Sequence, residues 1–161
     1  MSDGVEWALH GCLMLAWLDD EGPLATATLA AAFDLSASYL NKQMQALGRA
    51  GIVRSSPGPR GGFTLARPTD RITLLDIVNA VEGPDEAFRC REIRQHGAMA
   101  KVPRAEFREE CVFAKAMRRA DVAWRHELAA QTLADIQASI DGDSPKAGER
   151  MRRWYDMRRS G

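Results

Sequence analysis

Two cysteines are the side chains in this sequence best suited to redox or metal chemistry. Cys90 and Cys111 bound a stretch, residues 91–110, that has no clear helical or strand pattern. Thiolates bind zinc, copper and iron–sulfur clusters, but a cluster usually takes four protein ligands. Two thiols are therefore too few to hold a cluster, and the other ligands would have to come from elsewhere in the protein.

A carboxylate and an imidazole near the N-terminus can supply such ligands. Glu6 and His10 are four residues apart in a segment with helical periodicity, so their side chains project from one helix face, one turn apart. At that spacing the pair can chelate one metal ion. Each residue also has a simpler explanation, because Glu6 can be a solvated residue favoured by the helix dipole and His10 can fill a surface groove.

Other candidate residues carry less weight. His96 lies between the two cysteines and competes with His10 as a ligand, although this histidine can equally lie in a turn. Cys12 lies in an apolar helical segment, which predicts a core position. Cys111 has no recognisable histidine and acid partners for nucleophilic catalysis. We therefore expect no enzymatic activity and no small-molecule substrate.

Composition and charge bound the class of protein. The chain has 161 residues, of which 45% are hydrophobic and 27% are charged, and its formal net charge is zero. A basic segment nevertheless lies between residues 41 and 71, where Asp70 is the only acidic residue. Its cations are Lys42, Arg49, Arg54, Arg60, Arg67 and Arg71. Such a segment is typical of nucleic-acid binding.

The sequence shows no sign of export or membrane insertion. Neither a signal peptide nor an apolar run of about 18 residues is recognisable. We therefore expect a cytoplasmic protein without membrane association. In the reducing cytoplasm, cysteines are more often thiols or metal ligands than disulfides.

The first half of the chain begins with the pattern of a helix-turn-helix. Hydrophobic spacing predicts three helices, over Val5–Leu18, Leu29–Phe33 and Ala37–Ala50. Thr26 or Thr28 can cap the second helix, and Ser36 is a good N-cap for the third. Gly51 follows the third helix as a plausible C′ residue.

A β-hairpin is predicted directly after the third helix. Ile52–Ser55 and Gly62–Leu65 have strand character and are joined by a glycine-rich loop. The loop carries Arg60 near its tip, so the hairpin has the features of a wing. Thr73 and Asp76 then form a predicted capping box at the start of a fourth helix.

The second half predicts a long helix that needs a partner. This helix begins at Cys111 and has an apolar stripe along one face. The stripe consists of Phe113, Met117, Ala120, Trp124 and Leu128. A second subunit would cover the stripe, which indicates a homodimer. A last helix begins at Thr132, with Asp135 in a second capping box.

The expected fold is therefore mainly α with a small β-hairpin wing, a winged helix-turn-helix head plus a long dimerisation helix. The predicted DNA-binding domain covers residues 1–84, and a sensor loop covers residues 85–110. Residues 111–141 form the dimerisation helix and the following helix. Residues 142–161 are expected to be a polar C-terminal tail that is poorly ordered as far as Met151.

The expected partner of such a head is a double-stranded DNA operator. A helix fits the major groove, so base contacts should come from exposed positions near the start of the third helix. Those positions are Ser36, Ser38, Tyr39, Lys42 and Gln43. Arg60 on the wing suits insertion into the minor groove. The alternative is a helical hairpin in a protein that does not bind DNA.

Several sequence blocks resemble one family of bacterial regulators. The blocks are Ser38–Leu40, Leu47–Val53, Gly61–Pro68, Ile72–Gly83 and Thr132–Ile136. They resemble the winged-helix regulators that include IscR and NsrR, and the resemblance covers about residues 1–140. It implies a homodimeric transcription regulator in which a sensor loop lies beside crossing long helices. Cluster-bearing members typically hold a [2Fe-2S] or [4Fe-4S] cluster through three loop cysteines and one further residue.

This chain departs from the family pattern because the middle loop cysteine is missing. A regulator without a cluster is therefore one alternative. In the family, however, the first helix of one subunit approaches the sensor loop of the other, and residues 4–10 and 88–95 resemble those of a redox-sensing member. The resemblance implies a [2Fe-2S] cluster held by Cys90 and Cys111 of one subunit and by Glu6 and His10 of the other.

The mixed ligand set predicts redox sensing. A [4Fe-4S] cluster normally uses more thiolates, whereas zinc also accepts this set of ligands. Replacing two thiolates by histidine and carboxylate reduces the negative charge, and a related replacement raises the potential of Rieske centres. Trp7, next to Glu6, could repack when that charge changes, so it is the candidate redox-coupled residue. A repressor of the same family that senses nitric oxide is the other alternative.

Overall fold

The computed structural model describes residues 1–160 and divides the chain into two compact units. The first unit combines Met1–Gly83 with residues 128–160, and the second is Pro84–Glu127. Each unit is described by itself. The first contains the helix-turn-helix and the hairpin, so the expected class, mainly α with a small β-hairpin wing, is confirmed.

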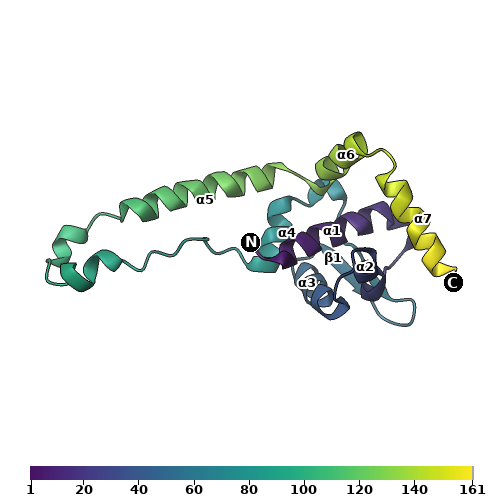
Figure 1. The fold of residues 1–161 in the computed structure, drawn as a ribbon, viewed down its shortest axis with the longest axis horizontal. Helices are drawn as coiled ribbons and strands as arrows, with labels where there is room; N and C mark the ends of the chain where they lie inside the picture. Colours follow the sequence, from purple (N-terminus) through teal and green to yellow (C-terminus); the bar gives the residue numbers. More distant parts are fainter. Residues whose placement is uncertain (161) are drawn as a thin grey trace. The chain divides into compact units, whose positions relative to one another are not determined.

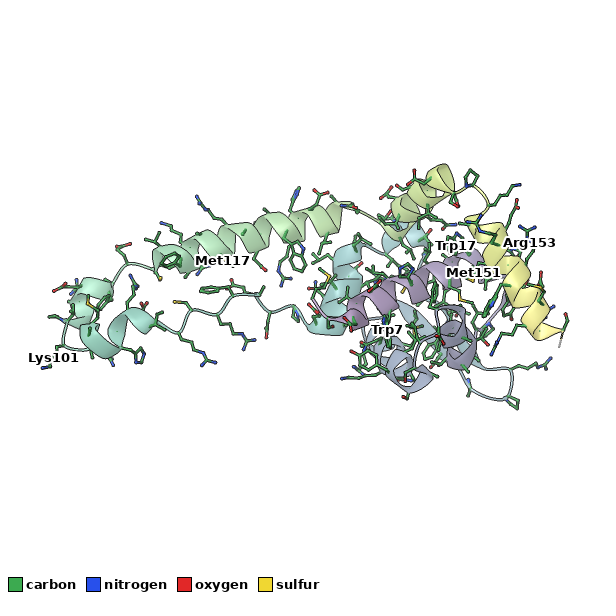
Figure 2. The ribbon with its side chains drawn as sticks, in the orientation of Figure 1. Trp7, Trp17, Lys101, Met117, Met151 and Arg153 are labelled. Atoms are coloured by element: carbon green, nitrogen blue, oxygen red, sulfur yellow. The ribbon has the colours of Figure 1, made fainter. Side chains whose placement is uncertain are left out.

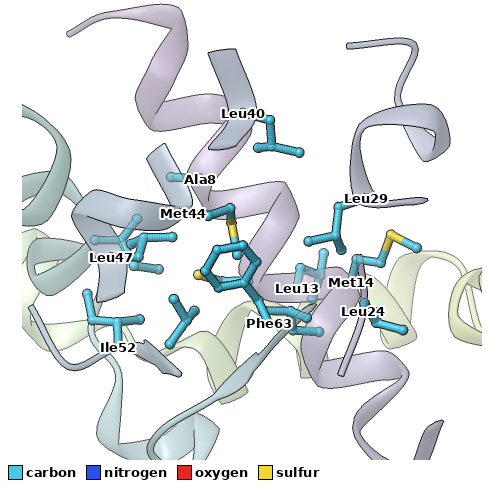
Figure 3. Packing of buried hydrophobic residues seen from close by; sticks show 14 of the residues in the cluster. Ala8, Leu13, Met14, Leu24, Leu29, Leu40, Met44, Leu47, Ile52 and Phe63 are labelled. Carbon is cyan, nitrogen blue, oxygen red and sulfur yellow. The ribbon is translucent and has the colours of Figure 1, made fainter. Parts of the chain in front are cut away.

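Helix α1 (Asp3–Trp17) forms the centre of the first unit. Figure 1 shows it passing through the middle of this unit, with α3 (Ala37–Arg49) and α4 (Leu74–Glu82) packed against it. Ala8 and Cys12 have no exposed surface. Figure 3 shows apolar side chains of α1, α3 and the hairpin meeting in one core. A helix that is apolar on most of its faces is buried, as here.

The helix-turn-helix consists of α2 (Thr26–Ala32) and α3. Ser36 caps α3 as expected, because its hydroxyl oxygen accepts a hydrogen bond from the backbone N–H of Tyr39 at 3.5 Å. Gly51 ends α3 with φ of 66°, a left-handed conformation that glycine adopts without strain. The predicted threonine cap of α2 is wrong, since α2 begins at Thr26 and Ala25 occupies its N-cap position.

The wing is an antiparallel hairpin of β1 (Val53–Ser56) and β2 (Gly62–Leu65). A third piece of chain pairs with it, because Leu24 and Phe63 exchange two backbone hydrogen bonds of 2.9 Å. A Cβ on Gly62 would lie 2.3 Å from the Leu24 backbone, so only glycine allows this close approach. The wing is thereby fixed to the segment that joins α1 to α2.

Two capping boxes fix the starts of α4 and α6 (Leu133–Asp143). Thr73 and Asp76 form the box of α4, and Thr132 and Asp135 form that of α6, as predicted. The two starts lie side by side, because Leu133 N–H donates to the Ile72 carbonyl at 2.8 Å. Each box satisfies backbone N–H groups that a helix leaves unpaired at its first turn.

The expectation that the tail is poorly ordered as far as Met151 is wrong, because a helix already begins at Ala147. Ala147–Arg159 forms a further helix, α7, in the first unit. Met151, Trp154 and Tyr155 pack against the core from this helix. They fall at i, i+3 and i+4, which is one helix face. Figure 2 shows Met151 on the side of α7 toward Trp17 and Arg153 on the outer side.

An ion pair joins α7 to the end of α1. Arg152 donates hydrogen bonds to both carboxylate oxygens of Asp20, at 2.7 and 2.8 Å, and to the Trp17 carbonyl at 2.8 Å. The hydrogen bond from Arg152 holds the pKa of Asp20 below its usual value. A carboxyl group with a lowered folded pKa stabilises the fold above its unfolded pKa, about 4, and this contribution is lost as the pH falls through the folded pKa.

Asp20→Asn should therefore lower the thermal midpoint at neutral pH, by no more than a few degrees because the pair is exposed. The difference from the wild type should shrink as the pH falls below about 4. Thermal melts followed by circular dichroism over this range measure both effects. Asp19→Asn is the control, since Asp19 is exposed and forms no ion pair within residues 1–160, and it should leave the midpoint at neutral pH unchanged. An unchanged midpoint for Asp20→Asn would show that this pair does not hold α7.

The second unit consists of short 3-10 turns and most of the long helix α5 (Val112–Ala130). The predicted long helix is confirmed and begins directly after Cys111. Several large apolar side chains on it are exposed, with 77% of Phe113, 44% of Met117 and 61% of Val122 accessible to solvent. No helix within the described part of the chain is long and apolar enough to cross a membrane.

Candidate metal centre and nucleic-acid interface

Cys90 and Cys111 line one pocket of about 330 Å³ in the second unit. Cys111 lies directly before α5 and is half-buried, whereas Cys90 is exposed. The remaining lining residues are Glu86, Phe88, Arg89, Glu92, Glu110, Ala114 and Arg118. We call this the cysteine pocket. The fold of this unit thus brings the two thiols together across the intervening loop.

The start of α5 favours a thiolate at Cys111. The pKa of Cys111 lies below its usual value, first because of the backbone N–H of Ala114 and then because of that of Phe113. These N–H groups have no partner within the helix, since they belong to its first turn. The positive charge of Arg94 acts in the same direction, while burial opposes it.

Arg94 organises the loop between the cysteines, a role that sequence reasoning missed. Its guanidinium donates to Glu92 Oε2 at 2.8 Å and to the Glu109 carbonyl at 3.1 Å, and it lies over the Phe107 ring. Glu92 in turn directs its backbone N–H at Cys90 Sγ, 3.4 Å away. No periodicity marks Arg94 in the sequence, because the loop is built of short 3-10 turns.

Glu6 and His10 line a second pocket, of about 250 Å³, in the first unit. Both side chains are exposed on α1, and Trp7, Phe33 and Leu35 complete the lining. The His10 and Phe33 rings lie 5.2 Å apart, centroid to centroid. We call this the Glu6–His10 pocket. The two side chains share one side of α1, as their spacing predicts.

Trp7 connects this pocket to the helix-turn-helix. Its ring meets the Tyr39 ring edge to face, with centroids 4.7 Å apart. Trp7 also lines the Glu6–His10 pocket, and Tyr39 is exposed near the start of α3. One aromatic contact therefore joins a candidate ligand pair to a candidate DNA-contacting residue.

The candidate donors fall into two separate pairs. Within residues 1–160, no three histidine, cysteine or acidic side chains are placed to hold one metal ion. His96 is exposed and does not line the cysteine pocket. Cys12 lies in the core, as predicted, and burial raises its pKa to about 12.

The exposed face of α3 carries most of the predicted DNA contacts. Ser36, Ser38, Tyr39 and Lys42 are exposed there, and the hydroxyl oxygens of Ser36 and Ser38 lie 3.0 Å apart. Arg60 is exposed in the loop of the wing. These side chains are polar and accessible, as contacts to phosphate or base edges require.

Gln43 is a correction to the sequence analysis, which placed it on the exposed face. It is 5% exposed and lies in the crossing of α3 with α1. A Cβ on Gly4 would lie 2.9 Å from the Gln43 carboxamide, so the glycine makes room for it. Gln43 therefore belongs to the packing between two helices and not to the DNA-contacting face.

Comparison with known proteins assigns the family. Residues 1–139 match the Rrf2 family model, described as an iron-dependent transcriptional regulator. The chain belongs to the Rrf2 family. YwgB of Bacillus subtilis (strain 168), which is named as an HTH-type transcriptional regulator, is 31% identical over 140 residues, 87% of this chain and 85% of YwgB. The resemblance to IscR-type regulators is thereby confirmed.

Other Rrf2-type regulators resemble this chain in part or in fold. IscR of Xenorhabdus nematophila is 33% identical over 85 residues, which cover 53% of this chain and 52% of IscR. The structure of CymR (YrzC), the global cysteine regulator of B. subtilis, is similar with a TM-score of 0.67 and 27% identity, over 86% of this chain and 96% of CymR. T. potens IscR shares the fold with a TM-score of 0.68 at 23% identity, over 89% and 90% of the two chains. As an Rrf2 protein, this chain is a DNA-binding transcription regulator.

Proposed function

We propose that the protein is a homodimeric regulator that senses redox state through a [2Fe-2S] cluster. Cys90 and Cys111 of one subunit and Glu6 and His10 of the other would hold the cluster. The observation that carries this proposal is the presence of two incomplete donor pairs, each lining a pocket of its own. Joined across a dimer, the pairs provide the four ligands that such a cluster takes.

The chemistry of the donors fits this group. Two thiolates suit iron–sulfur binding, and histidine replaces cysteine on one iron of Rieske centres. Cys90 is exposed and Glu6 and His10 lie on an exposed side of α1, so all three are accessible to a second subunit. Arg89, Arg94 and Arg118 lie near the thiols, and each is paired with an acidic side chain, Asp85, Glu92 and Glu110 respectively.

The exposed stripe on α5 supports the dimer. Phe113 and Met117 are large apolar side chains exposed to solvent, and they lie one turn apart on one face. Exposed apolar patches of this kind mark protein interfaces. A C2 dimer uses the same patch twice and so would cover both stripes at once.

Trp7 is the proposed connection between redox state and DNA binding. When bound, the cluster would supply a reversible one-electron change of charge. Glu6 and His10 would then tie α1 to the place where the charge changes, and the ring contact between Trp7 and Tyr39 would carry a displacement of α1 to the exposed face of α3. Two states of α1 biased by that charge would constitute the switch.

A regulator without a cluster is the second candidate. The missing middle cysteine favours it. The relatives of this chain also include CymR of B. subtilis, which is named as the global cysteine regulator and is 39% identical over 70 residues. In that case Cys90 and Cys111 would be redox-active or merely structural thiols. A repressor that senses nitric oxide would contain the same cluster. The two functions are distinguished by whether nitric oxide changes the affinity for DNA.

Anaerobic purification tests the proposal. The protein should be brown, absorb between about 400 and 500 nm, and contain about two iron and two sulfide ions per subunit. One-electron reduction should change both the spectrum and the affinity for operator DNA. A protein that contains zinc and no sulfide, or no metal at all, would exclude the cluster.

The wing gives a prediction for DNA binding that does not depend on the cluster. Arg60→Ala should weaken binding to a short mixed-sequence duplex about three- to tenfold and reduce the salt dependence by about one phosphate contact. Arg153→Ala is the matched control, since Arg153 is exposed on the outer side of α7. Fluorescence anisotropy across a series of salt concentrations measures both quantities. Equal losses for the two variants would contradict a wing contact.

A further inference from the structure

A third pocket lies in the first unit between α1, α2, α6 and α7. Its volume is about 430 Å³, which is within the range of small-molecule sites. The lining is Leu13, Trp17, Ala32, Phe33, Ile140, Ala147, Met151 and Trp154, with His10 and Arg150 as polar members. We call this the C-terminal pocket. Three aromatic rings and a thioether give it surfaces suited to a flat aromatic molecule.

The charged residues of this lining favour the binding of an anion. None of its residues is acidic, and Arg150 is its permanent cation. One N–H of Arg150 is donated to Ser144 Oγ at 2.7 Å. A guanidinium has five N–H donors, so Arg150 can also donate to a carboxylate while this hydrogen bond remains.

Trp17 contributes its indole ring to the same lining. Its Nε1 is buried and has no hydrogen-bond partner among the described residues. A Cβ on Gly148 would lie 3.3 Å from this nitrogen, so the backbone of α7 passes close to the indole edge. A buried N–H without an acceptor destabilises a protein. Because Nε1 is buried against Gly148 of α7, a ligand in the pocket would contact the indole ring and not this N–H.

The pocket depends on residues that follow the part of the chain matched by the family model. That match ends at residue 139, whereas Ile140, Ala147, Arg150, Met151 and Trp154 come later. Helix α7 is held in place by the Arg152 hydrogen bonds to Asp20 and by the side-chain packing described above. The C-terminal helix thus adds a preformed wall to the common Rrf2 head.

We propose that the C-terminal pocket binds a small aromatic carboxylate. The rings would stack on Trp17, Phe33 and Trp154, and the carboxylate would accept hydrogen bonds from Arg150. The site is complete within one subunit and needs no metal. His10 and Phe33 line this pocket and the Glu6–His10 pocket alike. A bound acid would therefore touch a proposed cluster ligand, and this last link alone rests on the proposed function.

Calorimetric titration of cluster-free protein with 2-naphthoate tests the site. We expect one molecule to bind per subunit, with a Kd on the order of tens of micromolar. 2-Naphthalenemethanol has the same rings without the charge and should bind about tenfold more weakly. Cyclohexanecarboxylate keeps the charge without the rings and should also bind more weakly. The absence of saturable binding of 2-naphthoate up to about 1 mM would overturn the proposal.

Substitutions locate the binding. Arg150→Gln should weaken binding about tenfold, whereas Arg153→Gln, on the outer side of the same helix, should not change it. Trp17→Phe keeps an aromatic ring but offers less surface for stacking, so it should weaken binding several-fold. Ala147→Phe should fill the pocket and abolish binding in a protein with an unchanged circular dichroism spectrum. Equal effects of Arg150→Gln and Arg153→Gln would place the ligand elsewhere.

Ligand binding and iron content together distinguish a failure of this proposal from a failure of the cluster proposal. Binding of 2-naphthoate to a protein that takes up no iron would support the C-terminal pocket and refute the cluster. An iron–sulfur protein that does not bind 2-naphthoate would do the reverse.

Discussion

Cys111→Ala should produce a colourless protein with less than about a tenth of the wild-type iron and sulfide. Cys111 is one of two thiols in the cysteine pocket, and its loss would leave three donors where a cluster takes four. Cys90→Ala should have the same result, because the two thiols line one pocket. Iron and sulfide analysis of anaerobically purified protein, together with the visible spectrum, measures the loss.

Cys12→Ala is the matched control for both variants. It also removes a thiol, but Cys12 lies in the core of the first unit and has no exposed surface. The variant should keep its colour and lose only stability, about 1 kcal/mol for the small cavity it leaves. If Cys12→Ala lost the iron while Cys111→Ala retained it, the assignment of the cysteine pocket would be wrong.

Subunits with complementary defects should restore one cluster per dimer. One subunit carries Cys90→Ala and Cys111→Ala and keeps Glu6 and His10. The other carries Glu6→Ala and His10→Ala and keeps both cysteines. The heterodimer then has one site with all four ligands and one site with none. We expect half of the wild-type iron and sulfide, whereas each variant homodimer should contain almost none.

Different affinity tags on the two subunits allow the heterodimer to be isolated after coexpression. The wild type carried through the same two-tag purification sets the reference iron content, and metal analysis with the visible spectrum gives the result. An empty heterodimer would show that the four ligands come from one subunit. A homodimer of Glu6→Ala and His10→Ala that keeps its full spectrum would instead remove these residues from the ligand set.

The features that depend on neighbouring residues were predictable from the sequence. The capping boxes of Thr73 and Thr132 are such features, because their partners are three residues away. Gly51 and the hairpin likewise follow from local backbone preferences. By contrast, Ala25 precedes α2 where a threonine cap was expected. The adjacent Leu24 is paired with the wing, which fixes the backbone there by a contact distant in sequence.

The features that depend on tertiary contacts were not predictable. Gln43 is polar and near the start of α3, so periodicity alone could not place it in the crossing with α1. Helix α7 was missed because arginines surround its short apolar stripe, and the stripe becomes meaningful only against the core of the first unit. Arg94 acts through its reach across an irregular loop. Residue type and spacing mark the two cysteines and the Glu6–His10 pair as candidates, and their role as cluster ligands stays a prediction.

The bond between the wing and Leu24 has a consequence for how such a dimer recognises its operator. The hairpin is hydrogen-bonded to the chain that follows α1, and α3 packs on α1. We therefore expect the wing and the recognition helix α3 to move together with α1. A displacement of α1 in the proposed dimer would then change the distance between the two DNA-binding parts more than it changes the DNA-contacting surface of each. On DNA this distance corresponds to the spacing between the two half-sites of the operator. That spacing is about 10 base pairs, which is one helical turn, or a multiple of it. The proposed redox switch therefore predicts that its two states prefer operators with different spacer lengths and the same half-site sequence.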